Sequence, residues 1–177
     1  GTLRRHRRSD LLTRLIEVQY HPDATCPIWE SFLGQIFSYN EDMVAFMRRA
    51  VGYSLTGDTS EQVLFFLYGT GANGKSTFLN LILRLLGRYG RQIEPDLLLS
   101  RRGEVHPTGL ADLEGTRFAV AMEIEDERRL AESLVKQMTG GDRLTARRMR
   151  QDFQEFWPTH KLWLGANHRP TVKGVDN

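Results

Sequence analysis

A glycine-rich run at residues 69–77 carries the clearest chemical signal in the sequence. It reads G-T-G-A-N-G-K-S-T, follows the apolar segment 63–68 and matches G-x-x-x-x-G-K-[ST] at every fixed position. The backbone amides of such a turn, and of the helix that starts after it, point at one place where a polyanion can bind. A glycine-rich turn with a chance lysine is the alternative, but it does not account for the matching flanks. The run therefore predicts a phosphate-binding loop.

The residues of this run have distinct expected roles. The glycines at 69, 71 and 74 are expected to allow positive φ and a close approach of the backbone to the ligand. Lys75 is expected to reach the β- and γ-phosphates, and Ser76 is expected to place its hydroxyl on Mg²⁺. The predicted cofactors are thus ATP and Mg²⁺. The predicted binding residues are Gly69, Gly71, Ala72, Asn73, Gly74, Lys75, Ser76 and Thr77.

Acidic side chains follow a second apolar segment, residues 117–124. A triphosphate site needs an acid at the end of a neighbouring strand, where it orients the shell of the metal or polarises the attacking water. Glu123 stands at that place, and Glu125 is the other candidate on the same face of an extended chain. We predict Glu123 and Ser76 as the metal-site residues. A solvated acidic strand end is the alternative.

A third short apolar segment, residues 161–166, ends at Asn167. An amide at the carboxyl end of a strand beside the first one can hydrogen-bond the γ-phosphate or the attacking water. Asparagine before a turn is common, so this signal depends on the other two strands. The predicted catalytic residues are Lys75, Glu123 and Asn167.

The segment that follows T-G-G-D at residues 139–142 is rich in arginine. Residues 144–156 alternate loosely and predict a hairpin, which can present its basic side chains to a phosphate backbone. The alternative is a solvated basic hairpin. Aromatic residues at 153, 156 and 157 interleave with the arginines, and their types favour core packing. The predicted nucleic-acid residues are Arg147, Arg148, Arg150 and Lys136, with Lys161 as a further flanking candidate.

The elements that must position these residues follow from hydrophobic periodicity. Buried strands are predicted at 63–68, 117–124 and 161–166. Helices are predicted at 28–37, 41–55, 76–86 and 128–138. Asn40 is expected to cap the second helix, and Gly87 is expected to end the third. Segments 11–20 and 93–100 fit either a helix or a strand, and both possibilities stay open.

Length and composition narrow the class of protein. The 177 residues, 40% hydrophobic and 26% charged with a net charge of +2, suit one domain with a small appendage. Arginine supplies 20 of the 24 basic residues, which fits phosphate contacts or merely a coding bias. The basic residues 1–10 are interpreted as a solvated arm, with direct DNA contact as the alternative. No apolar run approaches the ~20 residues of a membrane span, and the single cysteine favours a reducing cytoplasm.

Four motifs in chain order resemble the superfamily 3 helicases, specifically the helicase domain of phage and plasmid primase-helicases. They read G-T-G-A-N-G-K-S-T, R-F-A-V-A-M-E, K-Q-M-T-G-G-D-R-L-T-A-R and K-L-W-L-G-A-N-H-R-P. The upstream segments H-P-D-A-T-C-P-I-W-E-S-F-L and V-G-Y-S-L-T-G-D are similar to the part that precedes the ATPase core in that family. The resemblance covers residues 11–177.

The resemblance implies an α/β fold, namely a RecA/AAA+-like αβα P-loop NTPase core with a small helical N-terminal part. The helical segment would span residues 1–60, and the core would span 61–177 and be truncated at its C-terminus. The implied function is an ATP-dependent DNA helicase of phage or plasmid replication that translocates on single-stranded DNA and unwinds duplex. The full-length protein would form a homo-oligomeric, hexameric ring in the cytoplasm of a bacterial host, with no membrane partner.

The resemblance also carries over to single residues. Residues 74–77 match the first motif, Glu123 matches the acid of the second, Lys136 and residues 139–142 match the third, and Asn167 matches the sensor asparagine of the fourth. Many relatives have two adjacent acids in the second motif, whereas Met122 precedes a single glutamate here, which leaves open whether Glu123 or Glu125 is the base. The family places its arginine finger beyond the last residue of this chain. We therefore expect nucleotide binding with poor hydrolysis.

Two other classes of function share parts of this pattern. A DNA-binding or origin-recognition module could use ATP only structurally. A small-molecule kinase needs an acceptor pocket and lid arginines, and a GTPase needs an N-K-x-D motif, which the sequence lacks.

Overall fold

The computed structural model describes residues 4–100, 107–124 and 128–168. Its centre is a four-stranded sheet in the order β1-β6-β3-β2, in which all three neighbouring pairs are parallel. The strands are β1 (Leu64–Tyr68), β2 (Gly90–Gln92), β3 (Phe118–Ile124) and β6 (Lys161–Ala166). The order places β6 between β1 and β3, so the first two predicted strands are not neighbours in the sheet.

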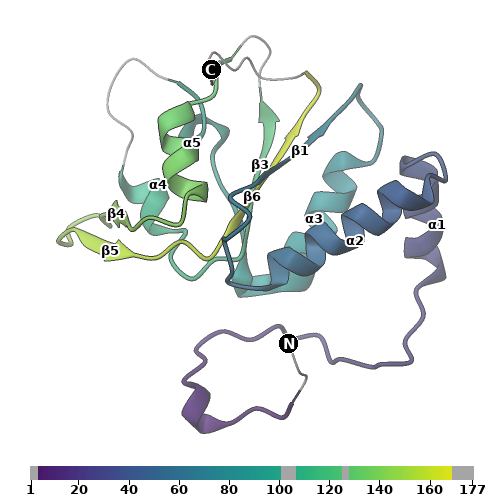
Figure 1. Ribbon diagram of the computed structural model, residues 1–177, viewed down its shortest axis with the longest axis horizontal. Coiled ribbons are helices and arrows are strands. Elements are labelled where there is room, and N and C mark those ends of the chain that lie inside the picture. The colour runs from purple at the N-terminus through teal and green to yellow at the C-terminus, as the bar shows by residue number, and fades with distance from the viewer. Residues whose placement is uncertain (1–3, 101–106, 125–127, 169–177) are drawn as a thin grey trace.

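Helices cover both faces of this sheet (Figure 1). One face carries α1 (Pro27–Ile36), α2 (Glu41–Leu55) and α3 (Lys75–Leu86). The other face carries α4 (Pro107–Ala111), α5 (Glu132–Thr139) and an antiparallel hairpin of β4 (Leu144–Ala146) and β5 (Gln154–Phe156). Short 3-10 turns are η1 (Arg8–Asp10), η2 (Gly87–Tyr89) and η3 (Pro95–Leu97). No helix in the described ranges is long and apolar enough to cross a membrane.

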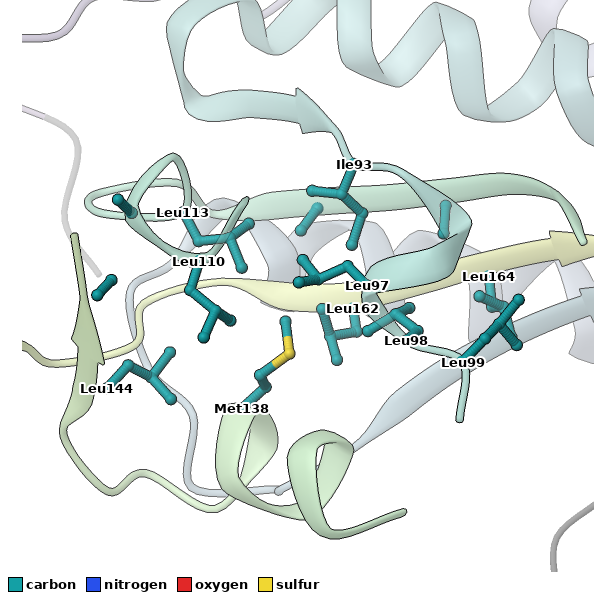
Figure 2. Close-up of a cluster of buried hydrophobic side chains, with 14 of the residues drawn as sticks. Ile93, Leu97, Leu98, Leu99, Leu110, Leu113, Met138, Leu144, Leu162 and Leu164 are labelled. Carbon is teal, nitrogen blue, oxygen red and sulfur yellow. The ribbon is translucent and has the colours of Figure 1, made fainter. Parts of the chain in front are cut away.

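Strands β3 and β6 read as nearly continuous apolar runs because both of their faces are buried. Alternate residues point to opposite faces, so Val120 and Trp163 pack under α1–α3, whereas Ala121 and Leu164 pack under α4 and α5. Figure 2 shows the second of these two clusters, in which leucines of the strands meet Met138 of α5 and Leu144 of the hairpin.

Trp163 joins the central strand to α2 by a buried polar contact. Its indole Nε1 donates to Oγ of Ser54 at 3.0 Å, and that hydroxyl donates to the carbonyl of Ala50 at 2.8 Å. The indole ring also stacks on Phe65 with a centroid distance of 4.4 Å. Both polar groups are therefore satisfied in a site where an unpaired donor would destabilise the fold.

The sequence-based prediction of most elements is confirmed. Helix α2 has the predicted bounds, and Oδ1 of Asn40 accepts a hydrogen bond from the Met43 amide at 3.0 Å. Gly87 follows α3 with φ 51, and its amide donates to the carbonyl of Leu83. Helix α1 begins at Pro27, whose ring suits the first turn of a helix.

Three segments differ from the prediction or settle an open choice. Helix α5 begins at Glu132 rather than at residue 128, because the backbone before it is extended and Leu130 forms a bridge with Leu99. Within segment 93–100 the chain forms only the 3-10 turn η3 and this bridge. Segment 11–20 contains neither helix nor strand.

The N-terminal arm is anchored at Arg14, which lies just beyond the basic residues 1–10. Its guanidinium donates to the carbonyl of Arg88 at 3.0 Å and to the carbonyl of Glu114, and its own carbonyl accepts from the Tyr89 hydroxyl at 3.0 Å. Arg5, Arg7 and Arg8 are exposed, as a solvated arm predicts. Arg14 therefore holds the arm against the edge of the sheet.

His160 makes the fold sensitive to acid. Its side chain is 2% exposed, and neither ring nitrogen has a hydrogen-bond partner among the described residues. Burial, and then the charge of Lys161, lowers the pKa of His160 to about 4 from an ordinary 6.5. The unfolded chain therefore binds a proton at higher pH than the folded chain, so the stability associated with neutral His160 is present above pH ~6.5 and is lost as the pH falls towards ~4.

We predict that His160→Leu removes this pH dependence, which amounts to about 3 kcal/mol of unfolding free energy between pH 7 and pH 4. Urea unfolding of both proteins across this range measures the difference. The matched control is His21→Leu, which changes an exposed histidine and should unfold like the wild type. Equal losses of stability on acidification in the wild type and His160→Leu would contradict the prediction.

Candidate functional site

The glycine-rich run connects β1 to α3 at the carboxyl edge of the sheet. Gly69 has φ 149 and Gly74 has φ 83, as the pattern predicts for glycine. Gly71 does not have a positive φ, and the left-handed residue between these two glycines is Ala72 with φ 60. The prediction of a positive φ at Gly71 is therefore wrong, because the left-handed backbone conformation occurs one residue later, at Ala72.

The glycine-rich loop packs against α1. A Cβ atom on Gly74 would lie 2.5 Å from Cγ2 of Ile36 and 3.2 Å from the ring of Phe32. A Cβ atom on Gly69 would lie 2.5 Å from Nδ2 of Asn73. Gly74 therefore needs glycine for space as well as for φ, whereas at Gly69 the Asn73 side chain could move and φ is the stronger requirement. Through Gly74 the loop packs directly on the helical N-terminal part.

The first amides of α3 lie next to this loop and have no backbone hydrogen-bond partner among the described residues. The first hydrogen bond at its N-terminus runs from the Phe78 amide to the Gly74 carbonyl at 2.9 Å. The amides of Lys75, Ser76 and Thr77 precede this bond and have no intrahelical acceptor. Together with the helix dipole they favour an anion at this end of α3.

The ammonium group of Lys75 lies at the centre of the site. Its Nζ is 2.7 Å from the carbonyl oxygen of Gly69, 2.8 Å from Oδ1 of Asn73 and 3.3 Å from Oδ1 of Asn167. The structure thus brings Lys75 and Asn167, which are far apart in sequence, into contact. The loop and the end of β6 are joined through one cation that sits among neutral oxygens.

Glu123 lies at the same edge of the sheet on a distorted strand end. The register of β3 against β6 shifts between Met122 and Ile124, and Glu123 in between has φ 62. A left-handed conformation is costly for a residue with a side chain, and such bulges redirect the side chain away from the regular alternation. Glu123 is exposed. Glu125 lies outside the described residues.

Glu123 is separated from the loop by one strand. Parallel pairing places Tyr68 of β1 beside Ala166 of β6, and Ala166 beside Ile124 of β3. The acid was expected on a strand next to β1, but β6 occupies that position. Within the described residues Glu123 has no hydrogen bond or ion pair with Lys75.

The hairpin presents arginine and aromatic side chains on one outer face. Continuing the β4–β5 register, Arg143 faces Trp157 and Arg147 faces Phe153. The guanidinium carbons lie 5.0 Å and 4.8 Å from the respective ring centroids. Phe153 and Trp157 are 61% and 59% exposed, so the expectation that they belong to the core is wrong for these two. Phe156 is buried, because strand alternation points it inward.

The other basic residues of the prediction have different environments. Arg148 turns back towards α4, where its Nη2 lies 3.4 Å from the carbonyl of Ala111 and 3.9 Å from Oε2 of Glu114. Arg150 is exposed with φ 61 in the turn between the two strands, and Lys136 is exposed on α5.

Lys161 is not available to a nucleic acid. It is 2% exposed, and its Nζ donates to the carbonyls of Thr56 at 2.6 Å and Asp58 at 2.9 Å. Burial, followed by the charge of Arg117, lowers the pKa of Lys161 to about 8. The prediction that Lys161 is a nucleic-acid residue is therefore wrong. Its side chain instead connects the start of β6 to the loop that precedes β1.

Comparisons with known proteins give two family matches and a shared fold. A model for a family of unknown function, DUF5906, matches residues 67–177. A second model, described as D5 N terminal like, matches residues 1–38. The C-terminal region of NrS-1, in its A-form apo structure, aligns with a TM-score of 0.67 and 15% identity over 88% of this chain and 36% of that chain. This likeness shows a shared fold.

Two of the sequence relatives are viral proteins. "Putative helicase L207/L206" of Acanthamoeba polyphaga mimivirus is 33% identical over 125 residues, which are 70% of this chain and 13% of that protein. "Putative helicase 022R" of Frog virus 3 (isolate Goorha) is 28% identical over 153 residues, which are 82% of this chain and 16% of that protein. This chain therefore spans less than a fifth of either relative.

The family model begins within β1 and covers the glycine-rich loop, Glu123, the hairpin and Asn167, which is more than half of the chain. On that match, this chain belongs to the DUF5906 family.

Proposed function

We propose that this chain is the nucleoside triphosphate-binding core of a DNA helicase of the superfamily 3 type. The observation that carries the proposal is the position of Lys75. Its Nζ contacts the glycine-rich loop and lies 3.3 Å from Oδ1 of Asn167, and Lys75 is also the first residue of α3. The helicase names of the viral relatives support the same class of function.

The residues present suit ATP with Mg²⁺. Lys75 would exchange the neutral oxygens that it now contacts for the β- and γ-phosphates, which attract an ammonium more strongly. Mg²⁺ keeps several waters and takes few protein ligands besides the phosphates. The exposed hydroxyl of Ser76 and the exposed carboxylate of Glu123 can supply such ligands. The magnesium ion would neutralise phosphate charge during transfer.

The catalytic roles follow from where each group is anchored. Asn167 is held at the end of β6 and already reaches Lys75, so its amide can bind the terminal phosphate or the attacking water. Glu123 projects from the bulge of β3 and would polarise that water or help to hold the metal. In the full-length protein we propose that neighbouring subunits complete the site in a hexameric ring.

The outer face of the hairpin is the proposed contact for single-stranded DNA. Bases stack on aromatic rings and guanidinium planes, and arginines neutralise phosphates. Trp157 and Phe153 provide the rings, while Arg143, Arg147 and Arg150 provide charge along the same element. Lys136 is a further candidate, and Arg148 has a smaller part because it contacts α4.

We predict that Lys75→Ala weakens binding of Mg-ATP by at least about tenfold, because it removes the charge-assisted contacts to two phosphates. Isothermal titration calorimetry on the 177-residue chain measures this. Arg84→Ala, an exposed cation near the other end of α3, is the matched control and should bind like the wild type.

The same substitution in the longer protein separates a motor from a module that uses ATP structurally. A motor loses DNA-stimulated ATP hydrolysis and duplex unwinding with Lys75→Ala. If single-stranded DNA does not stimulate hydrolysis, and if Lys75→Ala leaves DNA binding and unwinding intact, the helicase proposal fails.

We predict that Trp157→Ala and Arg147→Ala each weaken binding of single-stranded DNA, by roughly 5- to 100-fold for the lost stacking surface. Arg147→Ala should also reduce the slope of log affinity against log salt by about one. Fluorescence anisotropy with a labelled oligonucleotide at several salt concentrations measures both effects. Arg49→Ala on α2 is the control; if it weakens binding as much as Arg147→Ala, the hairpin is not the specific contact.

A further inference from the structure

The outer face of the β4–β5 hairpin holds an acid between its two arginine–aromatic pairs. Strand alternation places side chains from both sides of the hairpin on this face: Arg143, Thr145 and Arg147, opposite Trp157, Glu155 and Phe153. The register pairs Thr145 with Glu155, so Glu155 lies midway between the two aromatic residues, about 7 Å along the strand from each. The hairpin stands at the periphery of the molecule, and this face is exposed (Figure 1).

We propose that Glu155 makes this face select among bases, because its carboxylate accepts a hydrogen bond from the exocyclic amino group of a base in the bound single strand. Cytosine, adenine and guanine carry such a group, whereas thymine and uracil do not. The inference rests on the proposed function, since it assumes that the hairpin contacts single-stranded DNA. It makes Glu155 a specificity-determining residue of that contact.

Glu155 is joined to the stacking surface through Arg143. Nη1 of Arg143 lies 3.3 Å from Oε2 of Glu155, and the guanidinium carbon of Arg143 lies 5.0 Å from the centroid of the Trp157 ring. A base that contacts the ring or the guanidinium is therefore within reach of the carboxylate. The side chains of Arg143 and Glu155 are 58% and 56% exposed, and Trp157 is 59% exposed, so the contacts among the three leave each of them accessible.

The carboxylate of Glu155 keeps hydrogen-bonding capacity for a base. Among the described residues, its side chain accepts a hydrogen bond only from Arg143, at Oε2, and Oε1 accepts none. An ionised carboxylate offers about four lone-pair sites, so most of this capacity remains. An exposed ion pair contributes little to stability, so Arg143 can also turn to a phosphate or to an acceptor on a base at small cost.

The chemistry of the base edges gives this acid its expected preference. An amino group on a base donates to a carboxylate, as when glutamate accepts from N4 of cytosine. Thymine and uracil donate only through a ring N–H that lies between two carbonyl oxygens, and these oxygens repel a carboxylate. An acid also repels the phosphates of the strand, so Glu155 would weaken a face that bound the backbone alone. A hydrogen bond to a base offsets that repulsion, and it does so only for bases with an amino group.

Binding of oligodeoxycytidine and oligodeoxyuridine of equal length tests the inference, because the two bases have the same size and differ only on this edge. Fluorescence anisotropy with the 177-residue chain, at a mildly alkaline pH where cytosine is neutral, measures both affinities. The chain should bind oligodeoxycytidine about fivefold more tightly, which is the lower end of what a good base contact provides, because the side chains are exposed.

Glu155→Gln should abolish this preference. A glutamine amide has both a donor and an acceptor, so it can pair with either base, and the loss of the negative charge should raise the affinity for both oligonucleotides. Asp152→Asn is the matched control, because it removes the same charge from an exposed residue between β4 and β5 that lies outside the pairs on this face. It should raise both affinities and leave their ratio at the wild-type value.

Each opposite result overturns a defined part. Equal binding of both oligonucleotides by the wild type would exclude the selection and leave the DNA contact itself standing. A preference that persists in Glu155→Gln would assign the selection to another residue. An equal loss of affinity for both oligonucleotides in Glu155→Gln would mean that Glu155 only positions Arg143. If the wild type binds neither oligonucleotide, the proposed contact with single-stranded DNA fails too.

Discussion

The parallel pairing of β6 with both β1 and β3 is the constraint on which the rest of the structure depends. Because the three strands run in the same direction, their carboxyl ends meet at one edge of the sheet. The glycine-rich loop, Asn167 and Glu123 follow or end those strands, so the topology gathers them at that edge. This is the place where open α/β sheets bind their ligands. Chemistry at the edge therefore depends on the burial of β6, which places Trp163 in one core cluster and Leu164 in the other.

The two faces of the sheet serve different parts of the proposed function. On one face, α1 packs against Gly74, so the helical N-terminal part supports the loop of the proposed nucleotide site. On the other face, the hairpin buries Leu144 and Phe156 in the core and turns its opposite side outward. The strand alternation that anchors the hairpin also exposes Trp157 and Phe153 beside arginines. The same strand alternation therefore buries one side of the hairpin and exposes the aromatic rings of the other.

Local patterns made much of the fold predictable. Periodicity predicts helix α2 with its Asn40 cap and the three long strands. Motif spacing predicts that Lys75 and Asn167 belong to one site. Long-range pairing was not predictable from local sequence, since the extended backbone before α5 depends on the bridge between Leu99 and Leu130. The same is true of Lys161, a charged residue whose burial depends on carbonyls of the loop before β1. The bulge at Glu123 and the outward position of Trp157 had no signal in residue type alone.

A crystal structure of this chain with Mg²⁺ and a non-hydrolysable ATP analogue would test the central claim most directly. We predict that the phosphates lie against the amides of Lys75, Ser76 and Thr77, and that Nζ of Lys75 moves from the Gly69 carbonyl onto the β- and γ-phosphates. Asn167 should then face the terminal phosphate from the end of β6. An analogue bound elsewhere, or one that leaves Lys75 on the carbonyl of Gly69 and on Asn73, would contradict the account.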